Sequence, residues 1–135
     1  VEPIDVSSTQ ITKSVSGEGD GSKRSSDTMG MKHRVDRGVY KFFGSMNPQL
    51  AEKTGFTDSD AKAIKAVLHR LFENDESSAR PAGSMQVMKV IWWQHNCKAG
   101  QYSSARVHGS LSVNPDGSYV ITPLEGLDTE VIEGF

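Results

Sequence analysis

Cationic side chains gather near the start of the chain, just before a group of aromatic residues. Lys32, His33, Arg34 and Arg37 stand against a single nearby acid, Asp36. Residues 38–46 then add aromatic rings, namely Tyr40, Phe42 and Phe43. Ammonium and guanidinium groups pair with phosphates, and flat rings can stack on bases. We therefore expect a basic loop at 29–37 and an aromatic strand at 38–46 that together suit a nucleic-acid backbone, with a solvated surface turn as the alternative.

Other chemistries lack the residue patterns that they require. The sequence has no phosphate-binding glycine loop, no dinucleotide-binding glycine turn and no His-Glu-x-x-His pair. The four histidines show no metal-ligand spacing, so no metal or cofactor is expected. Cys97 beside His95 or His108 lacks the third, orienting group that a nucleophile needs. Acid–base cleavage of RNA finds its residue types in His33 and Asp36, although such catalysis depends on geometry.

Composition narrows the class of protein. A chain of 135 residues can form one domain, and its net charge of −2 means that any nucleic-acid site must arise from local charge asymmetry. That asymmetry is present, because acids crowd the end of the chain from Glu125 onward. A single cysteine excludes an intrachain disulfide, which fits a cytoplasmic location, and no apolar run could span a membrane. The start at Val1, without methionine, favours a piece of a longer protein.

Apolar periodicity predicts the elements that position these groups. Alternation predicts a strand at 6–15, and a serine- and glycine-rich loop follows at 16–28. A short helical turn is expected at 49–53, and the main helix at 58–74. Thr57 and Asp60 form the signature of a capping box at its start. Its apolar stripe, which we expect to pack in the core, contains Ile64, Val67, Leu68, Leu71 and Phe72.

The second half of the chain contains further strands. Residues 86–95 are nearly continuous in apolar character, which predicts a central strand covered on both faces, with Trp92 and Trp93 on opposite sides. Residues 97–108 are expected to be a loop. Asn114-Pro115-Asp116-Gly117 predicts a hairpin turn, and the acidic tail is expected to extend along the surface. The predicted class is α+β, with an antiparallel sheet that forms part of a ferredoxin-like or RNA-recognition-motif fold.

Several short motifs resemble a known family. They are Met29-Gly30 with Lys32-His33, Gly38-Val39-Tyr40, the run LAEKTGF at 50–56, and Ser78-Ala79-Arg80. Together they resemble the backbone subunit of type I CRISPR surveillance complexes, the Cas-seven family, and are most similar to its I-C and I-B branches. The resemblance covers residues 1–96 well and the remainder loosely. Val35-Asp36-Arg37 departs from the family, where relatives usually have Val-Pro-Tyr.

The resemblance implies a fold and a function. The fold is a partial RNA-recognition-motif palm with one main helix and an inserted thumb loop, and members of the family are longer than this chain. Residues 1–135 would be the C-terminal part of one such domain, with the thumb at 16–37, the helix at 57–74 and a hairpin and tail at 109–135. The function is a non-catalytic backbone subunit of a Cascade antiviral complex. Its expected partners are guide RNA (crRNA), other copies of itself, other Cascade subunits and target DNA paired to the guide.

Seven residues are expected to contact guide RNA on this basis, with recognition of the backbone rather than of the sequence. They are Lys23, Arg24, Lys32, His33, Arg34, Arg37 and Arg80. Two alternatives remain open at this point. One is an endoribonuclease of the RNA-recognition-motif superfamily that uses His33 or Asp36. The other is a ferredoxin-like protein-interaction module with no nucleic-acid role.

Overall fold

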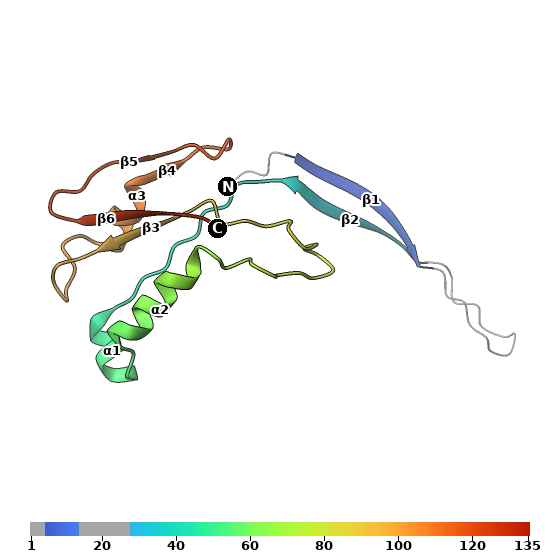
Figure 1. Cartoon of the computed structure of the whole chain (residues 1–135). Coiled ribbons are helices and arrows are strands. Elements are labelled where there is room, and N and C mark those ends of the chain that lie inside the picture. Colours follow the sequence, from blue (N-terminus) through green and yellow to red (C-terminus); the bar gives the residue numbers. More distant parts are fainter. Residues whose placement is uncertain (1–4, 14–27) are drawn as a thin grey trace, which may run out of the picture. The chain divides into compact units, whose positions relative to one another are not determined.

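The chain divides into two units in the computed structural model, which describes residues 5–13 and 28–135 (Figure 1). The first unit contains the chain up to Lys41 together with Asn114–Ser118. The second comprises Phe42–Val113 and Tyr119–Phe135. The described strands form three two-stranded antiparallel sheets and are accompanied by three helices. This agrees with the predicted α+β class.

The first unit is built on a long β-hairpin. Strand β1 (Asp5–Lys13) pairs antiparallel with β2 (Thr28–Arg37), and the register places Thr9 opposite Lys32. The strand expected at 6–15 is confirmed as β1. The loop expected at 29–37 is wrong, because these residues form β2. In β2 the apolar side chains alternate with glycine and charged residues, which is the two-residue period of a strand. Pairing with β1 also provides hydrogen-bond partners for backbone N–H and C=O groups of this charged segment. Most of the loop expected at 16–28 lies outside the described residues.

The segment that follows β2 is not a strand. Residues 38–46, which we expected to form one, have no regular secondary structure within the described chain. The residues that begin the next helix explain why this extended segment ends at Met46. The Asn47 side chain accepts hydrogen bonds from the backbone N–H groups of Gln49 and Leu50, and Pro48 occupies the first turn, so helix α1 (Pro48–Thr54) begins there. The helix ends at Gly55, whose φ of 78° suits glycine. The expected helical turn at 49–53 is confirmed.

Helix α2 (Asp58–Leu68) begins as predicted but ends earlier. Thr57 and Asp60 form a reciprocal capping box, which confirms the expected start. The expected end at residue 74 is wrong, because the N–H of Arg70 bonds to the carbonyl of Val67 and tightens the chain out of α-helical geometry. The core role expected for its apolar stripe is also wrong. The structure describes α2 in full and buries none of its residues, and Val67 is 58% exposed.

The second unit contains a sheet made from segments far apart in the sequence. Strand β3 (Lys89–Gln94) pairs antiparallel with β6 (Asp128–Glu133), and Lys89 lies opposite Glu133. The expectation of a central strand covered on both faces is wrong, because β3 pairs with one strand and is only half-buried. The acidic tail does not simply extend along the surface but forms β6. Its acids are tolerated there because Glu130 pairs with Lys65, and Glu133 with Lys89.

The remaining elements lie between these two strands in the sequence. Helix α3 (Ser104–Gly109) begins where the Ser103 hydroxyl accepts the N–H of Arg106, so the loop expected at 97–108 is wrong over its second half. Strands β4 (Leu111–Val113) and β5 (Tyr119–Ile121) confirm the expected hairpin, with Gly117 at a φ of 87° in its turn.

The apolar core of the described chain is small. Val107, Leu111 and Leu127 are its buried hydrophobic residues, and the buried Ser110 hydroxyl donates a hydrogen bond to the Val107 carbonyl. Trp92 and Trp93 lie on opposite sides of β3 as expected, because Lys65 of α2 lies over the ring of Trp92 whereas Trp93 lies beside His108 of α3. Within the part of the chain that the structure describes, no helix has the length and apolar character of a membrane span.

Candidate nucleic-acid interface

The β1–β2 hairpin sorts the predicted cations onto different faces. Successive side chains of a strand point to opposite sides, so Lys32 and Arg34 share one face of β2 whereas His33 belongs to the other. On β1, Thr9 lies opposite Lys32, and Ser7 opposite Arg34. Lys32 and Arg34 thus stand two residues apart on a polar ribbon. We call these two residues the cationic face.

Arg34 is already engaged by an acid on the same face. Its Nε and Nη2 atoms donate to Oδ1 of Asp36 at 2.9 Å and 2.8 Å. The hydrogen bond from Arg34, followed by one from Ser7, lowers the pKa of Asp36 below its ordinary value. Asp36 is therefore ionised at neutral pH and offsets part of the Arg34 charge. For Lys32 the described residues provide no carboxylate partner.

The opposite face of the hairpin is more apolar. Met29, Met31 and Val35 share it with His33, and Met29 is 65% exposed. The Nδ1 atom of His33 lies 2.7 Å from the Ser8 hydroxyl. His33 and Asp36 consequently point to opposite sides of the ribbon. His33 and Asp36 therefore do not meet at one phosphodiester, whereas the endoribonuclease alternative uses either residue.

Four further predicted contact residues remain, and the structure describes two of them, Arg37 and Arg80. Lys23 and Arg24 lie outside the described residues. Arg37 lies opposite Asp5, beyond an irregularity in the pairing of β1 and β2. Arg80 belongs to the second unit, in the loop after α2, where its Nε lies 3.2 Å from Oδ2 of Asp75. Of the seven predicted residues, the structure brings Lys32 and Arg34 together.

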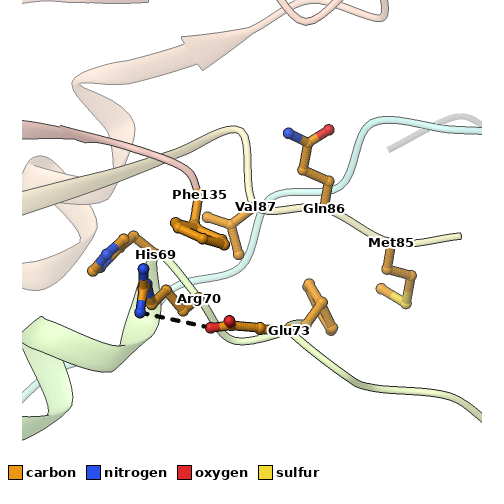
Figure 2. A pocket seen from close by; sticks show the side chains of 8 residues that line it. His69, Arg70, Glu73, Met85, Gln86, Val87 and Phe135 are labelled. Carbon is orange, nitrogen blue, oxygen red and sulfur yellow. Dashed lines mark ion pairs between the residues drawn. The ribbon is translucent and has the colours of Figure 1, made fainter. Parts of the chain in front are cut away.

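A separate cavity lies in the second unit (Figure 2). The guanidinium of Arg70 stands 3.9 Å from the centre of the Phe135 ring, and Glu73 pairs with Arg70 at 3.8 Å. His69 accepts the N–H of Phe135 through its carbonyl, while its buried Nδ1 has no hydrogen-bond partner among the described residues. The volume of about 80 Å³ is well below that of a typical small-molecule site.

Sequence reasoning missed two aromatic contacts of α3. His108 stacks on Phe43, and the Arg106 guanidinium lies 4.8 Å from the ring centre of Tyr102. The predicted loop at 97–108 concealed both contacts. The Ser103 cap, together with the basic Arg106 and His108 in the last turn, was the signal that could have revealed the helix.

Comparison with models of protein families gives a match over nearly the whole chain. The family model described as CRISPR-associated protein Cas7 matches residues 1–131. No curated protein matches the chain.

Proposed function

The chain belongs to the CRISPR-associated protein Cas7 family, and from this premise we propose that it binds guide RNA through the cationic face of its β1–β2 hairpin. It acts as a non-catalytic backbone subunit of a Cascade complex. The carrying observation is the placement of Lys32 and Arg34 on one side of an exposed ribbon. Cations at this spacing contact successive phosphates, which positions the RNA and leaves its sequence to be read by base pairing.

Assembly with other molecules is supported by the exposure of the same hairpin. A two-stranded hairpin alone is at best marginally stable in water, and this one leaves Met29, Met31 and Val6 on its surface. Guide RNA on one face and protein on the other would cover it. The proposal accordingly includes other copies of this chain and other Cascade subunits as partners, and target DNA paired to the guide.

The finer assignments rest on the motifs of the sequence. We propose membership of the I-C or I-B branch, a partial RNA-recognition-motif palm with the hairpin as its thumb, and action in the cytoplasm. No observation favours the interaction-module alternative. No observation supports the endoribonuclease alternative, in which His33 or Asp36 would act.

Neutralising the cationic face tests the proposal. Binding of several unrelated single-stranded RNAs is measured over a range of salt concentrations for the unaltered chain and for Lys32→Gln with Arg34→Gln. Since single-stranded binding has a slope of about −0.7 per phosphate contact, the slope should become shallower by about 1.4. The loss should be equal for all RNA sequences.

A control variant separates the effect of where the charges lie from the effect of the net charge. Lys53→Gln with Lys62→Gln removes the same two charges from α1 and α2. It should leave the slope close to that of the unaltered chain. If both double variants reduce the slope equally, or if the unaltered chain binds no RNA, the proposed role of the cationic face is wrong.

A further inference from the structure

Helix α2 and the turn after it carry an exposed apolar stripe. Ile64 and Val67 lie three residues apart and Leu71 follows four residues later, which is the spacing of the contact face between paired helices. Val67 is 58% exposed, Leu71 47% and Ile64 37%. Another face of the helix turns toward β6, where Lys65 pairs with Glu130. The part of the chain that the structure describes therefore leaves the outer stripe, Ile64, Val67 and Leu71, largely uncovered.

Charges of opposite sign lie at the two ends of the outer stripe. Asp60 lies at its start, in the first turn of α2, and Arg70 lies at its other end. Both hydrogen bonds from Thr57 reach Oδ2 of Asp60, so Oδ1 accepts none among the described residues. The Arg70 guanidinium lies over the Phe135 ring and has a long ion pair of 3.8 Å with Glu73, which leaves N–H donors for another acceptor.

This arrangement is complementary to itself after a half-turn. When two α2 helices lie antiparallel, Ile64 of each faces Val67 of the other, and Asp60 of each comes next to Arg70 of the other. The helix dipoles then run in opposite directions, which is favourable, whereas parallel helices would place Asp60 beside Asp60. An apolar centre with an acid at one end does not suit an RNA backbone, which requires cations. The surface therefore fits a second copy of itself.

We propose that α2 is a self-association surface, through which two copies of this chain pair with antiparallel helices about a two-fold axis. The inference goes beyond the proposed function, because the contact needs no RNA and uses no residue of the cationic face. A two-fold contact is closed, so it joins two copies and does not extend a row of them. A helix of 11 residues is about 16 Å long and about 10 Å wide. The contact is thus much smaller than the roughly 800 Å² per partner of a standard interface, and the association should be weak.

Sedimentation of the chain without RNA, at protein concentrations from micromolar to millimolar, tests the proposal. The unaltered chain should show a reversible equilibrium between monomer and dimer. Val67→Asp places a carboxylate without a partner at the centre of the contact and should weaken the dimer by about tenfold or more. Val120→Asp is the matched control, because Val120 of β5 is exposed to a similar extent, 61%, and should leave the dimer unchanged. Circular dichroism checks that both variants are folded.

Charge reversal tests the antiparallel orientation. Arg70→Glu should weaken the dimer, because it places an acid next to Asp60 of the other copy. Asp60→Lys should weaken it in the same way by placing two cations together. A mixture of the two variants should form a mixed dimer, since both end contacts are then attractive. In a parallel pair, like charges would already face each other, and Arg70→Glu alone would not weaken the dimer.

Four results would overturn the inference. One is a chain that stays monomeric at every concentration, and another is an equal loss of the dimer in Val67→Asp and Val120→Asp. A dimer that Arg70→Glu does not weaken would exclude the antiparallel pair. So would a mixture of the charge variants that associates no better than either variant alone. None of these results bears on the cationic face, whose test measures RNA binding.

Discussion

Replacing Asp36 with asparagine should strengthen RNA binding. The Asp36 carboxylate receives two hydrogen bonds from Arg34 and occupies the same face of β2. The ion pair is exposed, with 70% of the Arg34 side chain and 37% of the Asp36 side chain accessible, and exposed pairs contribute little to stability. The substitution should therefore leave the fold unchanged and release the full charge of Arg34 for a phosphate.

The magnitude follows from Coulomb's law. A phosphate bound to Arg34 would lie about 6 Å from the Asp36 carboxylate, where repulsion in water is about 0.7 kcal/mol. Removing that repulsion should tighten binding by about threefold. Because Arg34 contacts a phosphate in both proteins, the salt slope should stay close to that of the unaltered chain.

A salt titration of RNA binding at neutral pH, with gel analysis of the RNA afterwards, provides the measurement. Arg34→Gln combined with Asp36→Asn serves as the control, because the gain should vanish without the guanidinium. Weaker or unchanged binding by Asp36→Asn alone would refute the electrostatic reasoning. If the unaltered chain cleaves RNA and Asp36→Asn does not, the endoribonuclease alternative is correct instead.

Two predictions concern the stability of the second unit. The Thr57 hydroxyl donates a hydrogen bond to Asp60 and lowers the pKa of that carboxyl. The hydrogen bond therefore stabilises the folded state above the ordinary pKa of 3.8, and this stabilisation is lost as the pH falls through the lower pKa of the folded state. Asp60→Asn should reduce stability at neutral pH and remove this acid dependence, as followed by urea unfolding monitored by circular dichroism; an unchanged acid profile would contradict it. Leu111→Ala should destabilise the chain by about 2 kcal/mol, the low end for a buried leucine because the core is small, whereas the same change at the exposed Leu50 should cost much less. Equal losses at the two positions would mean that Leu111 is not a core residue.

Local signals predicted the elements that depend on them. The capping box at Thr57, the Asn-Pro start of α1 and the Asp-Gly turn between β4 and β5 each involve side chains that bond within a few residues, so sequence alone sufficed. The elements that were missed depend on partners far along the chain. β6 became a strand because β3 offers it a ladder and Lys65 and Lys89 offset its acids, and no local pattern contains that information.

The candidate site was predicted in its residue types but not in its arrangement. The density of charge in 29–37 favoured a loop, and this concealed the alternation that places Lys32 and Arg34 together and His33 behind them. Arg80 matched a motif, yet its ion pair with Asp75 depends on the path of an irregular loop, which spacing could not reveal. The Phe43–His108 stack joins residues from two segments that were both assigned incorrectly.

Strand β3 carries adjacent indoles that are committed to different neighbours. Lys65 of α2 lies 5.3 Å from the ring centre of Trp92, and Trp93 flanks His108. A backbone shift of the strand cannot move one indole without moving the other, because consecutive side chains share the same rigid peptide unit. A displacement of the β3 backbone would therefore disturb the Lys65 contact and the His108 contact together. The two tryptophans thus give β3 one contact with α2 and another with α3.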